Sequence, residues 1–97
     1  MIKDVEVAMV HAANYALDYQ DKNCNADIEE VIKQFVKDFG SSDIKPALRV
    51  YSIAAINEIL KIKREKENKG KNNKQLMQKF TNRIPEMSRR IKEESED

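Results

Sequence analysis

Apolar side chains recur at helical spacing in four stretches of this chain, separated by short polar segments. In the first stretch they alternate at intervals of three and four positions, at Ile2, Val5, Met9, Ala12, Ala16 and Tyr19. This spacing keeps the residues on one side of an α-helix, which we expect to end near Gln20. Val10, Ala13 and Leu17 widen the apolar stripe, so the helix is expected to contact two others.

The second stretch predicts a helix from about Asp27 to Phe39, whose apolar face holds Ile28, Val31, Ile32, Phe35, Val36 and Phe39. Either Asn25 or Asp27 can cap its first turn, and the second choice places Glu30 three residues on, as a capping box requires. Gly40 follows the last apolar residue, where a left-handed C-cap is common.

The third stretch predicts a helix from Asp43, a suitable N-cap, to about Glu67, with Pro46 in the first turn. One face holds Ile44, Leu48, Tyr51, Ala55, Ile59 and Ile62, and a second holds Val50, Ile53, Ile56 and Leu60. A helix that is apolar over so wide an arc is typically the central one. We therefore expect Ile59 to be buried against the first two helices.

Thirteen consecutive residues, 63–75, contain no apolar side chain and carry a net charge of +4. Because the apolar face of the third helix stops at Ile62, its last turns are expected to project as a charged extension and fray toward Gly70. The segment is therefore interpreted as a basic linker without an apolar anchor.

The fourth stretch begins near Asn73 and keeps helical spacing across Pro85, with apolar residues at Leu76, Met77, Phe80, Ile84, Met87 and Ile91. An interior proline removes a hydrogen bond and disfavours helical geometry in the preceding residue. We expect a helix that is kinked or, preferably, broken, with one part ending near Arg83 and the next starting at Pro85. The acidic tail 93–97 should be frayed.

Together these patterns predict an all-α fold, a small bundle of four helices in a single domain spanning residues 1–97. Its parts are a three-helix acidic core (1–62), the basic segment (63–75) and a C-terminal helical segment (76–97). A chain of 97 residues buries one modest core and leaves little room for a deep active-site cleft.

No apolar run is long enough to cross a membrane, and acids near the N-terminus, Asp4 and Glu6, argue against a signal peptide. A single cysteine, Cys24, cannot form an internal disulfide, which fits a reducing compartment. We expect a cytoplasmic protein that does not bind membranes.

Charge divides the chain: residues 1–60 carry −4, residues 61–92 carry +9 and the last five residues carry −4. The two halves can simply attract each other within the bundle, which is the interpretation we favour. Alternatively, the basic half forms a surface for a polyanion or a protein partner. That surface would consist of Lys61, Lys63, Arg64, Lys66, Lys69, Lys71, Lys74, Lys79, Arg83, Arg89, Arg90 and Lys92.

The turn before Asp43 joins two helices closely enough for a helix-turn-helix unit. Its recognition helix would offer only Lys45, Arg49 and Ser52 to bases, so a plain helical hairpin is the preferred interpretation.

Residues that could perform chemistry are few. The single histidine, His11, shares a helix face with carboxylates too far apart to bind one metal, and it is interpreted as a surface residue. Tyr15 and Tyr19 are interpreted as the edge of the core, and Cys24 as a loop residue, because Lys22 is the only nearby cation that could activate its thiol. We expect no enzyme activity, no cofactor and no metal.

The sequence therefore favours a non-enzymatic helical protein that acts through protein–protein interaction or self-association. The alternative is a small nucleic-acid-binding or regulatory protein that uses residues 61–92. A fourth helix on a flexible linker could also pack on a second copy, so a homodimer, domain-swapped or side by side, is expected at moderate concentration.

Overall fold

The structure is a computed structural model in which residues 4–39 and 46–95 are described, and it is all-α, as predicted. Its elements are α1 (Val5–Lys22), α2 (Ile28–Phe39), the 3₁₀ turn η1 (Pro46–Leu48), α3 (Arg49–Arg64), the 3₁₀ turn η2 (Lys66–Asn68) and α4 (Asn73–Ser95). The radius of gyration is 13.0 Å, the value expected for a compact domain of this length. The predicted Gly40 and Asp43 caps lie outside the described residues.

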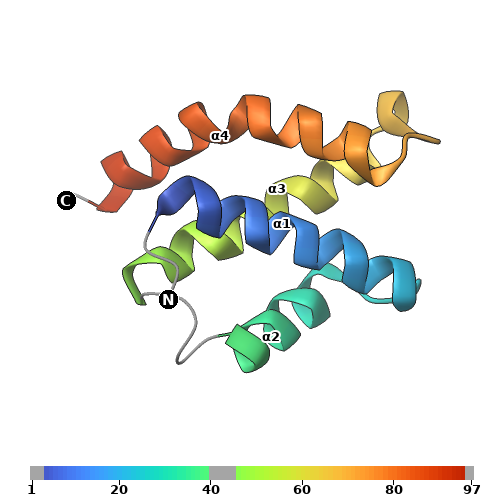
Figure 1. Cartoon of the computed structure of the whole chain (residues 1–97), viewed down its shortest axis with the longest axis horizontal. Helices are drawn as coiled ribbons and strands as arrows, with labels where there is room; N and C mark the ends of the chain where they lie inside the picture. Colours follow the sequence, from blue (N-terminus) through green and yellow to red (C-terminus); the bar gives the residue numbers. More distant parts are fainter. Residues whose placement is uncertain (1–3, 40–45, 96–97) are drawn as a thin grey trace.

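Helices α1 and α3 pack along each other at the centre, with α2 on one side of α1 and α4 on the other (Figure 1). Both central helices contact all three of the others, so α3 shares the central place predicted for it, and α1 has one neighbour more than predicted. The buried face of α1 is rich in small side chains: Ala8, Met9, Ala12, Ala13, Ala16 and Leu17. Small contact residues allow a short distance between helix axes, which explains the extensive packing of α3 on this face.

The core lies between these helices and contains Ile59, which is 0% exposed, as the sequence predicts. Leu48 and Ala55, from the same predicted face of α3, are also buried, and Tyr51 is half-buried. The apolar side chains of α4 that enter the core are Leu76, Phe80 and Ile84. The fourth helix therefore packs on the bundle of its own chain.

Side-chain caps fix the starts of three helices. The Asp4 carboxylate accepts a hydrogen bond from the Val7 N–H (3.1 Å). The Asp27 carboxylate accepts one from the Glu30 N–H (2.8 Å), which selects Asp27 among the two caps considered for α2. Before α4, the Asn72 side chain accepts from the Gln75 N–H (2.9 Å), and the Gln75 side chain accepts from the Asn72 N–H (3.0 Å). This reciprocal pair explains why α4 begins at the predicted position.

The predicted frayed extension of the third helix is wrong, because α3 ends at Arg64 and the chain then turns sharply through η2. Asn68, at the end of η2, is only 2% exposed. Its amide donates to the Ile62 carbonyl (2.8 Å), and the Lys79 ammonium donates to its side-chain oxygen. Gly70 then adopts a positive φ of 88°, which glycine allows at no steric cost. A buried polar side chain therefore anchors the segment interpreted as a linker.

The predicted break at Pro85 is also wrong, since α4 is one helix that contains this proline (Figure 1). Phe80 and Ile84 are buried on one face, and they keep their register only if the helix continues. Pro85 lies on the exposed side, as does Thr81, whose carbonyl loses its usual donor and can instead be hydrated. Packing of the apolar face thus outweighs the local preference of proline.

Candidate functional site

The twelve candidate cations follow the hairpin that α3 and α4 form. Three end α3, three lie in η2 and its flanking loop, and six lie on α4: Lys61, Lys63, Arg64; Lys66, Lys69, Lys71; and Lys74, Lys79, Arg83, Arg89, Arg90, Lys92. The structure brings most of them to one end of the hairpin, while Arg89 and Arg90 lie near the other end of α4.

Two of these cations hold α4 against the preceding elements. Arg83 bridges Glu58 (3.2 Å) and Glu65 (3.4 Å), and Lys79 lies 3.8 Å from a Glu67 oxygen. The Arg83 pairs are about one-third exposed, so each is partly screened by water and contributes modestly to stability. Of these three pairs only Arg83–Glu58 joins residues 1–60 to residues 61–92, so a single ion pair supports the interpretation that the two halves attract each other. Glu65 and Glu67 belong to the basic half, and all three pairs engage Arg83 and Lys79 within the bundle.

Arg89 and Arg90 form pairs along α4, with Glu93 (3.5 Å) and Glu86 (2.9 Å) respectively. Both pairs have i,i+4 spacing and are well exposed, so they add only a few tenths of a kcal/mol. The predicted fraying of the tail does not reach Glu93, which lies within α4.

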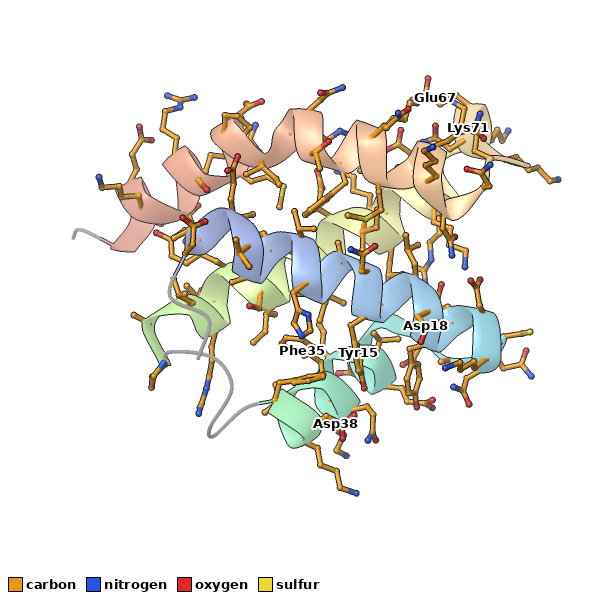
Figure 2. All side chains as sticks on the ribbon, in the orientation of Figure 1. Tyr15, Asp18, Phe35, Asp38, Glu67 and Lys71 are labelled. Atoms are coloured by element: carbon orange, nitrogen blue, oxygen red, sulfur yellow. The ribbon has the colours of Figure 1, made fainter. Side chains whose placement is uncertain are left out.

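The other eight candidate cations make no ion pair with a carboxylate of the described residues. They are Lys61, Lys63, Arg64, Lys66, Lys69, Lys71, Lys74 and Lys92. Six of the eight fall within residues 63–74, which we call the hairpin tip. Figure 2 shows Glu67 and Lys71 at this end of the molecule, where the chain returns from α3 to α4.

A second feature is an open groove between α1 and α4. It consists of three neighbouring depressions of about 550, 460 and 420 Å³. The first two share Glu6 and Ile84, and the last two share Val10 and Thr81, so the depressions form one continuous path. We call this path the α1–α4 groove.

Apolar side chains along the α1–α4 groove are Val5, Val7, Val10, Met77, Ile84 and Pro85, and polar residues alternate with them. Val7 is 53% exposed, about as much as Val50, but it lies beside other apolar residues of the groove. At one end Asp4 and Glu6 line the groove, and Lys74 lines the other end. The Asn73 amide donates to the Asp21 carboxylate (2.7 Å), which ties α1 to α4 beyond the second end.

His11 is not a surface residue, as the sequence analysis supposed. It is half-buried and meets Phe39 edge to face, with ring centroids 4.9 Å apart. Tyr15 packs against Phe35 and Phe39, which confirms its place at the edge of the core (Figure 2). The aromatic rings therefore join α1 to α2 and have a structural role.

The two tyrosines of α1 donate hydrogen bonds to acids of α2, Tyr15 to Asp38 (2.8 Å) and Tyr19 to Glu30 (3.0 Å). The pKa of Tyr15 is raised above its ordinary value, first by burial and then by its hydrogen bond to Asp38. The pKa of Tyr19 is also raised, mainly by its hydrogen bond to Glu30. Both phenols therefore stay protonated at neutral pH and are poorly suited to act as bases.

Because the pKa of Tyr15 is raised in the folded protein, the free energy of unfolding should fall at alkaline pH. An unfolded tyrosine titrates near pH ~10, so above that pH the unfolded chain loses a proton that the folded chain retains. The stabilisation is complete below about pH 10 and is lost as the pH rises further. Urea unfolding at about pH 9 and about pH 11 should show a smaller loss of stability for Tyr15→Phe than for the wild type. The control variant Tyr51→Phe should lose as much stability between the two pH values as the wild type. Equal losses for the wild type and both variants would contradict the assignment of the effect to Tyr15.

The described residues of the helix-turn-helix alternative are poorly placed to contact bases. Ser52 is buried and donates to the Leu48 carbonyl (3.1 Å), so it cannot reach a base. Arg49 is half-buried, and Lys45 lies outside the described residues.

Among residues 4–39 and 46–95, no group of three His, Cys, Asp or Glu side chains could hold a metal ion. No helix within these ranges has the length and apolarity needed to cross a membrane. Cys24 is exposed in the connection between α1 and α2.

Sequence reasoning missed the α1–α4 groove. Val7 lies off the apolar stripe of α1, and Thr81 lies off that of α4, so neither was singled out. The available signal was Val7, an apolar residue outside the apolar stripe of its helix.

Comparisons with protein-family models, with curated proteins and with solved structures give no match to this chain. Two surfaces of the molecule are therefore candidates for binding a partner, the α1–α4 groove and the hairpin tip.

Proposed function

We propose that this chain is a non-enzymatic protein-binding module that receives an amphipathic helix of a partner in the α1–α4 groove. The observation that supports this function is the continuous groove, with apolar residues in each of its three depressions, together with the half-exposed Val7. Exposed apolar residues that line a groove and have polar neighbours are typical of protein-binding sites.

The dimensions suit a short helix. The groove follows α1 from Asp4 to Asn14, a rise of about 15 Å, or roughly three helical turns. A helix of this length presents two or three apolar anchors at i, i+3/i+4 and i+7. Together the anchors contribute about 3–9 kcal/mol when buried, and association costs at least about 4 kcal/mol, so we expect a dissociation constant no tighter than about 0.1 mM.

Charge gives the partner helix a direction. The Glu6 side chain forms no hydrogen bond or ion pair with another described residue, and Lys74, at the far end, forms no ion pair with a described carboxylate. A partner with a basic C-terminal end and an acidic N-terminal end would match both charges and also its own helix dipole. Such a helix would run antiparallel to α1, with its basic end beside Glu6.

The test uses a fluorescein-labelled amphipathic peptide of about four turns, with leucines on one face, glutamate near its N-terminus and lysine near its C-terminus. Its binding is measured by fluorescence anisotropy. Val7→Gln should weaken binding about tenfold, because it places an amide where the leucines require an apolar contact.

Val50→Gln is a matched control. Val50 is 50% exposed against 53% for Val7, and each lies in the first turn of its helix, but Val50 lies outside the groove. Unchanged binding by this control, together with loss of binding by the same peptide with scrambled leucines, supports the proposal. Equal weakening by both variants, or no binding of the original peptide at millimolar concentration, refutes it.

Self-association remains a second proposal, and one observation bears on its form. The Lys79 ammonium of α4 donates to the Asn68 side-chain oxygen, and exchange of α4 between two copies would break this contact within each chain. A dimer formed side by side is therefore the form to expect over a swapped one. Sedimentation equilibrium at low and high salt tests this, and a monomer at every concentration would rule out both forms.

A further inference from the structure

The hairpin tip concentrates positive charge in a short, exposed segment. Residues 63–74 hold six cations and only two anions, Glu65 and Glu67. The cations are Lys63, Arg64, Lys66, Lys69, Lys71 and Lys74. Four of these six are exposed, and the other two, Lys63 and Lys71, are half-buried.

The two acids of the tip are neutralised from outside it. Glu65 pairs with Arg83 (3.4 Å), and Glu67 lies 3.8 Å from the Lys79 ammonium. The pKa of Glu65 is lowered, chiefly by a hydrogen bond with Glu67 and then by the charge of Arg83. Because α4 supplies both counter-charges, none of the six cations of the tip, four of them exposed, forms an ion pair with a carboxylate of the described residues.

Like charges also meet within this region. The pKa of Lys71 is lowered, chiefly by the neighbouring Lys79 side chain, while the charge of Glu67 acts in the opposite direction. The Lys79 ammonium is held by the Asn68 side-chain oxygen and lies near Glu67, so of these two lysines only Lys71 counts among the cations without a carboxylate partner. The tip is therefore an electrostatically unsatisfied surface that favours a polyanion.

We propose that the hairpin tip binds the phosphate backbone of a double-stranded nucleic acid without reading its sequence. This inference is independent of the α1–α4 groove and of the function proposed for it. It limits the nucleic-acid alternative, which the sequence placed on residues 61–92, to the cations of the hairpin tip.

The lack of apolar side chains in residues 63–75 decides among polyanions. Single strands are held largely by bases that stack on aromatic rings, and the segment has none. Stable attachment to a lipid surface needs an apolar face that enters the acyl region, which is also missing here. A duplex exposes its phosphates and keeps its bases stacked inside, so cations alone suffice to bind it.

The distribution of acids fixes which end of the molecule approaches the duplex. Figure 2 shows Asp18 and Asp38 on the part of the bundle formed by α1 and α2, away from Glu67 and Lys71 at the tip. One acid of α1, Asp21, lies beside the tip, where its carboxylate accepts a hydrogen bond from the Asn73 amide. Phosphates would be repelled by the first region and attracted by the second. The tip therefore leads, and the remainder of the bundle faces away from the backbone.

The test measures the affinity of the full chain for a random-sequence DNA duplex over a series of salt concentrations. For four to six phosphate contacts, the logarithm of the binding constant should fall against the logarithm of salt with a slope of about −4 to −5. Lys66→Gln combined with Lys69→Gln should reduce the steepness of that slope by about 2 and weaken binding at least ~10-fold at low salt.

Lys33→Gln combined with Lys37→Gln is the matched control, because it removes the same charge from exposed positions of α2. It should leave the slope nearly unchanged. All four positions are exposed, so both double variants should keep the wild-type helical circular dichroism.

Equal effects of the two double variants would show that only net charge matters and would overturn the proposal. It would also be overturned if the wild type fails to bind duplex at low salt. Two competition experiments complete the test, one with phosphatidylserine vesicles and one with a single strand of the same length. Tighter binding to either competitor would identify it, and not the duplex, as the ligand. Preference for the duplex in both experiments supports the proposal.

Discussion

Replacing Ile59 by alanine is expected to lower the free energy of unfolding by about 2–5 kcal/mol. The side chain is 0% exposed and lies on the face of α3 that forms the centre of the core. The substitution removes three carbons from a packed site, so it loses both their transfer free energy and the contacts around the remaining cavity. For a domain of this size, that loss is a large share of the total stability.

Urea unfolding followed by circular dichroism measures the effect. Val50→Ala, a change on the exposed side of the same helix, should alter stability by less than about 0.5 kcal/mol. A loss well under about 1 kcal/mol for Ile59→Ala would show that the core is not centred on this face of α3.

Replacing Pro85 by alanine is expected to stabilise the protein by as much as about 3 kcal/mol. The proline occupies the interior of a continuous helix, on its exposed side, where it removes a hydrogen bond to the Thr81 carbonyl. Alanine would restore that bond and adds no atoms that need space. Part of the gain is offset because alanine is less restricted than proline in the unfolded chain.

Pro46→Ala provides the comparison, because Pro46 is the first residue of η1, where no helical hydrogen bond is lost. It should be neutral or mildly destabilising. If α4 were instead divided at Pro85, with the proline at the start of a second helix, Pro85→Ala would also be neutral or destabilising. The sign of the change therefore separates a continuous helix from a broken one.

The helices and much of the core could be predicted from the sequence because each depends on local signals. Apolar periodicity identified the faces of α2 and α3, and Asp27 with Glu30 marked the start of α2. These signals act within a few residues, so they can be read without knowing which helices pack together.

The errors occurred where tertiary contacts outweigh local preference. Nothing in the composition of residues 63–75 distinguishes Asn68 from the other polar residues, since its burial depends on the Ile62 carbonyl and on Lys79. Likewise, the continuity of α4 through Pro85 depends on the burial of Ile84 in a core built by other helices.

The two proposed surfaces differ in how far the sequence indicated them. The cations of the hairpin tip were all candidates from the start, but only the ion pairs of Arg83 and Lys79 show which cations remain free of carboxylates. The α1–α4 groove could not be anticipated, because it arises where the flank of α1 that carries Val7 meets α4. Periodicity defines the face that each helix buries, and it does not define which flanks of two helices border each other.

The most direct test of the account is a heteronuclear NMR titration of the ¹⁵N-labelled chain, first with the amphipathic peptide and then with the DNA duplex. The two ligands should shift two separate sets of amide signals. The peptide should shift signals around Val7, Val10 and Thr81, and the duplex should shift those of Lys66 and Lys69. If both ligands shift the same residues, or if neither shifts the residues assigned to it, the division into an apolar groove and a basic tip is contradicted.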